Sequence, residues 1–382
     1  MGGSGGILNK RIDRRRFLAA AGVSIGAGAV ALANTQCDPA LIRRIQQQKT
    51  ALPPQHRVWV WQFSADGRPE QIASALAGLH CAVMMKTHDG LEWMSTYDHA
   101  PGAISGPGQV QTIASIFERA GVPFHAWSVV KGIDPAREAQ MAYEVLSAGA
   151  RSLTLDLEGS SGFWLGSRDD ALRFGDELRG RTPFGRVDLS IDPRPWRINL
   201  VPMNELVAYT DAILPQLYWD TFDSPDNLSG YEAAGYPAPH GMSPEFLLDA
   251  TAAILAPYNR PILPVGQGAA ADPATWPRFA HRAWELKMES ISVWRYAVTP
   301  PATLQYVGAN PPGREPQAPP PTPTPTPSAT TTPERTSTRT PTRTPTRTRT
   351  PSPTRTPTGT PTPTGTPTPT AVPATLTPAA TP

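Results

Sequence analysis

Cysteine is scarce in this chain of 382 residues, which has only Cys37 and Cys81. At most one disulfide bond can form, so a fold stabilised by several disulfides is excluded, and we expect Cys81 to be a small buried residue before a strand. Long apolar runs are lacking too. The uncharged stretch near the start is too short and too rich in Ala and Gly to span a bilayer stably.

The first 33 residues have the pattern of an export signal. A basic segment, Arg14-Arg15-Arg16-Phe17-Leu18, precedes an Ala/Gly/Val run that ends at Ala31-Leu32-Ala33. This pattern predicts a twin-arginine signal cleaved after Ala33. We therefore expect an extracellular or cell-surface protein that meets a membrane only during export. Residues 34–54 are expected to form a short lead-in segment.

Residues 311–382 have the composition of a stalk. They consist almost entirely of Thr, Pro, Ser and Arg, with Thr-Arg-Thr-Pro repeats and very few apolar residues. Such a segment cannot bury a core, so we predict a disordered, partly polyproline II spacer. No apolar anchor or sorting signal is recognisable in it.

Net charge separates these ends from the middle of the chain. The whole chain carries +2, whereas the first 33 residues carry five basic residues and one acidic residue, and the part from Arg314 onward has seven Arg and two Glu. Residues 34–313 are therefore acidic, at about −7. An acidic body argues against nucleic acid as a partner.

The middle of the chain alternates strand-like and helix-like segments eight times. The predicted strands are 57–63, 81–87, 123–130, 152–158, 187–192, 212–219, 261–266 and 290–296. The predicted helices are 69–79, 108–120, 135–148, 169–179, 203–209, 244–256 and 273–286. Eight such repeats in about 250 residues predict an α/β fold, a (β/α)8 TIM barrel over residues 55–310.

The last helix is the weakest part of this pattern. Thr299-Pro300-Pro301 leaves only residues 302–307 for it, so it is predicted to be short or missing. The alternative is a doubly wound open sheet. That fold gains no support from the sequence, because no Gly-rich phosphate loop follows the first strand.

One predicted strand carries two acids on the same face. In Ser152-Leu153-Thr154-Leu155-Asp156-Leu157-Glu158, leucines alternate with polar residues, so Asp156 and Glu158 point the same way. Two carboxyl groups two strand positions apart can reach the separations used in glycosidic bond cleavage. The structural alternative is a pair that caps the next helix or binds an arginine.

Active sites of (β/α)8 barrels lie at the carboxyl ends of the strands. The polar and aromatic residues predicted there, besides the two acids, are Gln62, Lys86, His88, Asp89, His125, Trp127, Asp192, Gln216, Tyr218, Trp219, Asp220, Gln267 and Trp294. Seven tryptophans lie at or just after strand ends: Trp61, Trp93, Trp127, Trp164, Trp196, Trp219 and Trp294. Indole rings together with amides and acids suit a hydroxyl-rich ligand such as a glycan. Some of these indoles will instead fill the barrel.

Three short motifs resemble known glycosidases. Residues 83–90, Val-Met-Met-Lys-Thr-His-Asp-Gly, and 155–159, Leu-Asp-Leu-Glu-Gly, resemble strands of the lysozyme-type muramidases of glycoside hydrolase family 25. Residues 215–220, Pro-Gln-Leu-Tyr-Trp-Asp, resemble the sixth strand of family 18 chitinases, which also carry an Asp-x-Glu pair and a Trp on the eighth strand, here Trp294.

The resemblance implies a glycosidase acting on a polysaccharide, N-acetylated as in peptidoglycan, without a metal or cofactor. Glu158 would be the general acid and Asp156 an ionised partner. Asp156 would either orient an N-acetyl group, with Tyr218 holding the developing oxazolinium, or stabilise an oxocarbenium ion directly. Gln216, His125 and Lys86 would bind sugar hydroxyls or a lactyl carboxylate. Gln62 departs from the family 25 pattern, which has Asp there. A monomer is expected.

Two other functions remain open at this point. A non-catalytic glycan-binding barrel displayed on a stalk would explain Gln62. A metal-dependent hydrolase would use His88, Asp89 and His125 together with an acid, although the first strand has no His-x-His motif. The loop over residues 221–243, with His240, is either a lid over the site or a surface insertion.

Overall fold

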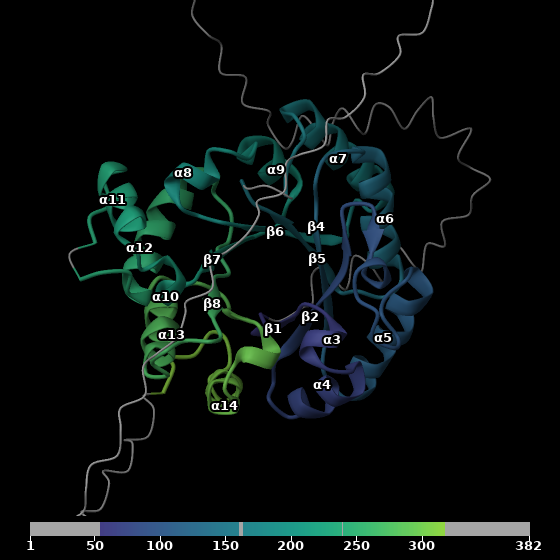
Figure 1. Ribbon diagram of the computed structural model, residues 1–382, viewed down its shortest axis with the longest axis horizontal. Coiled ribbons are helices and arrows are strands. Elements are labelled where there is room, and N and C mark those ends of the chain that lie inside the picture. Colours follow the sequence, from purple (N-terminus) through teal and green to yellow (C-terminus); the bar gives the residue numbers. More distant parts are fainter. Residues whose placement is uncertain (1–53, 160–162, 239, 318–382) are drawn as a thin grey trace, which may run out of the picture. The chain divides into compact units, whose positions relative to one another are not determined.

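A closed barrel of parallel strands forms the centre of the molecule (Figure 1). The computed structural model describes residues 54–159, 163–238 and 240–317. Among them, eight parallel strands close into a ring, because β1 pairs with both β2 and β9. These strands are β1 (Arg57–Val60), β2 (Ala82–Asp89), β4 (Phe124–Val129), β5 (Ser152–Leu157), β6 (Arg186–Ile191), β7 (Ile213–Leu217), β8 (Val265–Gln267) and β9 (Ser292–Trp294). The predicted (β/α)8 fold is confirmed.

Helices surround the strands on the outside (Figure 1). The longer ones are α4 (Pro69–Leu76), α5 (Pro107–Arg119), α6 (Pro135–Ser147), α7 (Arg168–Arg181), α9 (Met203–Tyr209), α12 (Pro244–Leu255), α13 (Thr275–Glu285) and α14 (Pro301–Ala309). Several begin with Pro behind a capping side chain: Asp134 caps α6 and Ser243 caps α12. The last helix is present and is nine residues long.

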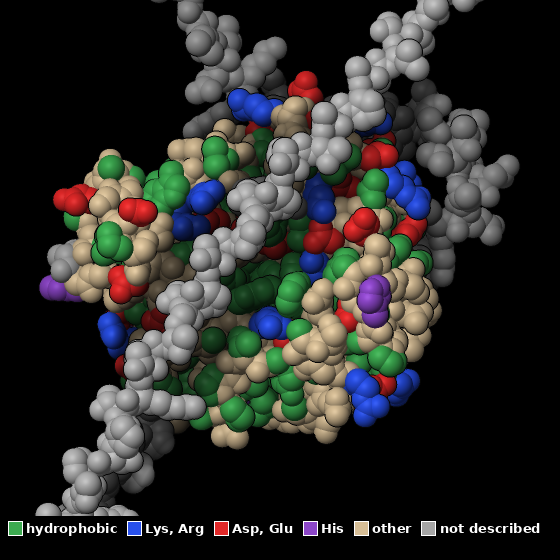
Figure 2. Space-filling model, in the orientation of Figure 1, with side chains coloured by type: hydrophobic (Ala, Val, Ile, Leu, Met, Phe, Trp, Pro, Cys, Tyr) green, Lys and Arg blue, Asp and Glu red, His purple; other side chains and the backbone are tan. Residues whose placement is uncertain are grey.

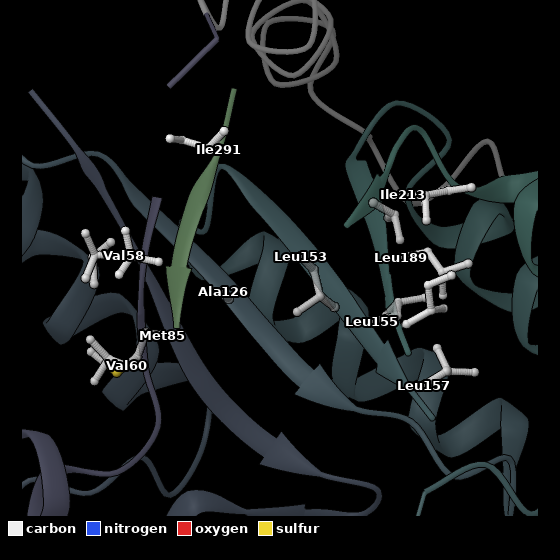
Figure 3. Close-up of a cluster of buried hydrophobic side chains, with 14 of the residues drawn as sticks. Val58, Val60, Met85, Ala126, Leu153, Leu155, Leu157, Leu189, Ile213 and Ile291 are labelled. Carbon is white, nitrogen blue, oxygen red and sulfur yellow. The ribbon is translucent and has the colours of Figure 1, made fainter. Parts of the chain in front are cut away.

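Strand alternation sends leucines outward and polar groups inward. Leu153, Leu155 and Leu157 of β5 are fully buried and belong to the core between strands and helices, part of which Figure 3 shows. Their neighbours Asp156 and Glu158 therefore face the barrel interior, because successive side chains of a strand alternate sides. The period-2 prediction for this strand is confirmed.

Aromatic side chains fill the upper interior of the barrel. Trp59 lies 5.2 Å from Trp127 and 5.6 Å from Trp294 between ring centroids, and Trp127 and Trp294 are also 5.6 Å apart. The Trp127 indole N–H donates to the Val60 carbonyl at 2.9 Å. These rings make the interior a packed core beneath the mouth, as is usual for barrels of eight strands.

A polar layer lies at the opposite, amino-terminal end of the barrel interior. Arg57 at the start of β1 donates to Asp188 of β6 at 2.8 Å, and both side chains are buried. Arg186 donates to the same carboxylate at 3.1 Å. His125 also lies in this layer, where its Nδ1 is 2.7 Å from the Ser152 hydroxyl oxygen. This layer closes the amino-terminal end of the barrel, the barrel floor, and its buried charges are stabilised by pairing with one another.

Removal of the Asp188 carboxylate is expected to destabilise the fold strongly. In Asp188→Ala, Arg57 stays buried without its counter-ion, and breaking a buried pair in this way costs about 3 kcal/mol or more. The control is Glu245→Ala, which breaks the largely exposed pair with Arg278 and should cost about 1 kcal/mol or less. Urea unfolding of both variants measures the difference, and equal losses would contradict the role given to the floor layer.

Elements that the sequence did not predict lie mainly in the loops at the strand ends. The first strand ends at Val60 because residues 63–66 form α3 (Phe63–Asp66), in which Asp66 accepts backbone N–H groups of the strand end. The others are β3 (Glu92–Trp93), α8 (Pro195–Ile198), α10 (Trp219–Phe222) and α11 (Pro225–Ala233). The loop over 221–243 thus contains a helix, and His240 lies exposed after it.

The predicted signal and almost all of the lead-in segment lie outside the described residues, and so does the predicted stalk apart from residues 311–317. Cys37 also lies outside them, whereas Cys81 is buried and is a free thiol. Burial raises the pKa of the Cys81 thiol to about 12. Within the described ranges, we find no helix with the length and apolar character needed to span a bilayer.

Candidate active site

The two acids of β5 meet the side chain of Gln216 inside the barrel. The Gln216 amide Nε2 donates to Asp156 Oδ1 at 2.9 Å and to Glu158 Oε1 at 3.1 Å. It also lies 3.2 Å from the hydroxyl oxygen of Ser190 on β6. Strands β5, β6 and β7 are consecutive neighbours in the sheet, which is why these side chains converge. One amide therefore ties both carboxyl groups into a single polar cluster.

The two acids differ in exposure and in charge. Asp156 is buried. Glu158, two residues further along the chain and nearer the mouth, is half-buried. Burial and, after it, repulsion from Glu158 raise the pKa of Asp156 to about 8. This shift favours the protonated form of Asp156, which is the opposite direction from the expected ionised partner.

Partly exposed aromatic rings surround the acids at the mouth. Tyr218 follows β7, and burial together with the nearby charges of Asp156 and Glu158 raises the pKa of its hydroxyl, so the phenol stays protonated. Trp294, Trp61 and Phe163 are likewise half-buried and pack on the aromatic interior of the barrel. Figure 2 shows a hollow near the centre of one face, with hydrophobic side chains at its floor and charged ones around it.

Lysines hold Asp89 at one side of the mouth. Lys86 Nζ is 2.8 Å from Asp89 Oδ2, and Lys131 Nζ is 2.7 Å from Asp89 Oδ1. These two ammonium groups lower the pKa of Asp89, against the effect of its burial. The Lys86 ammonium also lies 5.2 Å from the Trp127 ring centroid. Asp89 is thus an ionised counter-ion of Lys86 and Lys131.

Arg194 holds Asp192 on another side. The guanidinium Nε donates to Asp192 Oδ1 at 2.9 Å, and Nη1 donates to Asn227 at 3.0 Å. The guanidinium carbon lies 4.3 Å from the Phe222 ring centroid. Burial opposes a charged Arg194, but the hydrogen bonds that Arg194 donates to Asp192, together with the charge of that carboxylate, raise the pKa of Arg194. Asp192 faces the acid cluster as part of a pair rather than as a third free acid.

Four predicted site residues are buried away from the mouth. His125 lies in the floor layer, where burial and then Arg57 lower its pKa well below the ordinary value. His88 contacts Thr87 and the Trp93 ring, and burial lowers its pKa to about 3. Trp127 is 2% exposed and Trp219 is also 2% exposed. None of these placements fits direct contact with a substrate.

Trp219 and Gln267 serve the packing of a loop instead. Trp219 packs outward on α13, with its ring 5.8 Å from that of Trp276. Gln267 accepts the backbone N–H groups of Asp220 and Thr221 at 3.1 and 3.2 Å and donates to the Asp220 carboxylate. Gln267 and Asp220 therefore fix the short helix α10. Gln62 lies two residues after β1, immediately before α3, and is half-buried.

The sequence predicts only part of this surrounding. Ser190 and Arg194, like Asp192, are polar residues at the end of the strand predicted over 187–192, but the sequence gives them no role in the site. Trp61 is predicted only as one of seven tryptophans at strand ends. Lys131 and Phe163 are not predicted, because they come from loops, whose folding carries no periodic signal.

The residues of the metal-dependent alternative do not converge. His88, Asp89 and His125 have the separate partners described above. Within the part of the chain that the structure describes, no group of three or more His, Cys, Asp or Glu side chains is arranged to hold a metal ion.

Comparisons with known proteins give only distant likenesses. No family model matches the chain, and no curated relative matches it. Similar solved structures include a family 18 chitinase from Cycas revoluta in complex with allosamidin, with 10% identity and a TM-score of 0.45 over 67% of this chain and 98% of that one.

Other similar structures include a second chitinase and enzymes of other activities. The catalytic-site mutants of a chitinase domain from Pyrococcus furiosus show 13% identity and a TM-score of 0.42, over 64% of this chain and 85% of that one. A mannanase catalytic domain from Streptomyces sp. SirexAA-E shows 11% identity and a TM-score of 0.39, over 64% and 76%. Aldolases are matched as well. Barrels of different activities are matched at similar scores, so these likenesses do not distinguish one activity from another.

Proposed function

We propose that this protein is an exported glycosidase that cleaves an N-acetylated polysaccharide such as peptidoglycan or chitin. The observation that carries the proposal is the contact of one amide, that of Gln216, with both Asp156 and Glu158 in the aromatic mouth of the barrel. A buried carboxyl group with a raised pKa beside a half-buried one is an arrangement suited to acid catalysis of glycoside cleavage.

The pair keeps one proton near neutral pH, because burial and mutual repulsion oppose two negative charges. Glu158 lies nearer the mouth, so the proton leaves through Glu158 to the glycosidic oxygen as the bond to the anomeric carbon breaks. The carbonyl oxygen of the substrate's N-acetyl group attacks that carbon and gives an oxazolinium ion. Asp156, now ionised, balances the positive charge of the oxazolinium ion. Water then attacks the anomeric carbon and opens the oxazolinium ring, and a proton of that water returns to the pair of acids.

Several groups support an uncharged sugar ring at this place. The Tyr218 phenol is protonated and can donate to a sugar oxygen, and Trp294 presents an indole at the mouth. Indole rings pack on the C–H faces of sugars. Lys86 is buried, and its positive charge is paired with the negative charge of Asp89.

Incubation of the exported protein with chitin, peptidoglycan, mannan and cellulose tests the proposal. New reducing ends are expected from an N-acetylated polymer and not from cellulose or mannan. A second candidate, a non-catalytic glycan-binding barrel, is favoured by Gln62, which follows β1 where the resemblance to family 25 calls for an Asp. Binding of a polymer without any release of reducing ends would favour that candidate, and cleavage of mannan or cellulose alone would contradict the N-acetylated substrate.

A further inference from the structure

Trp61, just after β1, is fixed at the mouth through its backbone and its ring. Its backbone N–H donates to Asp66 Oδ2 at 2.7 Å, and the side chain of Asp66 is completely buried. The other oxygen of Asp66 accepts from Arg295 Nη1 at 2.9 Å and from the Ala297 N–H at 3.2 Å. Asp66 thus joins the end of β1 to the segment that follows β9.

Arg295 covers the indole of Trp61. The guanidinium carbon lies 5.1 Å from the ring centroid, within the range of a cation–π contact. The same ring packs on the aromatic interior of the barrel, yet it stays half-buried rather than buried. A large apolar ring is therefore held in place with part of its surface in water.

The order of the strands around the barrel shows where Trp61 lies relative to the two acids. Strand β1 neighbours β9, which carries Trp294, and both lie across the barrel from β5, which carries Asp156 and Glu158. A sugar held between Trp294 and the acids therefore has its neighbour in the polymer beside Trp61 or on the opposite side. A pre-positioned ring loses little conformational freedom on binding.

We propose that Trp61 is a substrate-binding residue that stacks on a sugar unit adjacent to the cleaved one, and that Asp66 and Arg295 are positioning residues for it. The ligand is a glycan chain of several units rather than a single sugar. This inference rests on the proposed function. Arg295 sets the orientation of the indole, and Asp66 sets that of Arg295.

The test uses Trp61→Ala and Trp61→Phe in the full chain, with Trp284→Ala as the matched control, because Trp284 is an exposed indole on α13. Dissociation constants for chitohexaose and for the N-acetylglucosamine monomer are measured by calorimetry, and KM and kcat on chitohexaose are measured in parallel. We expect Trp61→Ala to weaken hexamer binding and raise KM about threefold to tenfold, with kcat changed less than twofold. Monomer binding and the Trp284→Ala protein should be unaffected, and Trp61→Phe should recover part of the loss.

The positioning role has its own variant. Arg295→Lys keeps a charge for Asp66 but removes the planar group over the indole, and we expect it to raise KM for the hexamer in the same direction as Trp61→Ala. Wild-type values in Trp61→Ala would overturn this inference alone. A wild-type protein that neither binds nor cleaves chitohexaose or peptidoglycan would overturn the proposed function and this inference with it. Circular dichroism of each variant shows whether the fold is kept.

Discussion

Replacement of Glu158 by glutamine is expected to lower kcat/KM on an unactivated polysaccharide by about 10² to 10⁴, the usual range for loss of a general acid. Glutamine keeps the size of the side chain, but it has no acidic proton to give to the glycosidic oxygen. The contact with Gln216 can be kept through the new amide oxygen, so thermal unfolding should change little.

A substrate with an activated leaving group separates acid catalysis from other roles of Glu158. A nitrophenyl glycoside needs little protonation of its leaving oxygen, so Glu158→Gln should lose far less activity on it than on the polymer. The control is Glu232→Gln, which changes an exposed residue of α11 and should behave as wild type. Equal losses on both substrates would show that Glu158 binds rather than protonates. Full activity on the polymer would remove Glu158 from the mechanism.

Asp156 should make the protein less stable as the pH rises toward 8. Its pKa is about 8 in the folded protein and 3.8 in its ordinary state, so between these values the folded chain holds a proton that the unfolded chain has lost. Unfolding then releases a proton, and the free energy of unfolding falls by about 1.4 kcal/mol per pH unit from this group. The loss is complete above about pH 8.

Asp156→Asn removes this titration and is expected to abolish cleavage. The difference in unfolding free energy between the variant and the wild type should grow in favour of the variant across pH 5 to 8, by roughly 4 kcal/mol over the whole range. The difference is the quantity to measure, because three histidines act in the opposite direction below about pH 6.5.

Those histidines are His56, His88 and His125, whose folded pKa values are lowered by burial. The unfolded chain therefore binds more protons at them below about pH 6.5, and they make stability rise with pH there. Their contribution cancels between wild type and Asp156→Asn. Urea unfolding at several pH values, with the exposed Asp226→Asn of α11 as control, gives the comparison. A difference that does not change with pH would show that Asp156 is ionised in the folded protein.

The fold and the acid pair were predictable because both depend on short-range alternation. Leu153, Leu155 and Leu157 set the outward face of β5, and this alone placed Asp156 and Glu158 side by side inside the barrel. The same rule, applied to the strand predicted over 212–219, excludes that Tyr218 and Trp219 both face the mouth, since consecutive strand residues take opposite sides; in the structure β7 ends at Leu217 and Trp219 begins α10. The sequence prediction included both, and only Tyr218 is at the mouth.

Depth along the barrel and partners from loops were not predictable. Alternation gives the face of His125 but not its level, and the level depends on how the strands are staggered around the ring. Asp89 and Asp192 are predicted as site acids because their ion-pair partners cannot be identified from the sequence. Lys131, which binds Asp89, lies on another loop, and the sequence does not show that the Arg194 side chain points to Asp192. The pKa of Asp156 depends on burial and on Glu158 together, and composition gives neither.

The contacts at the barrel's amino-terminal end have a practical consequence. His56, just before β1, hydrogen-bonds through Nε2 to the carbonyl oxygen of Asn310, just after α14, at 2.7 Å. The first and last residues of the barrel segment, His56 and Asn310, therefore lie next to each other at the end of the barrel opposite the acids. Immobilisation of the protein on a bead through a tag placed beyond Gln317 should thus leave the cleft open to large, insoluble material.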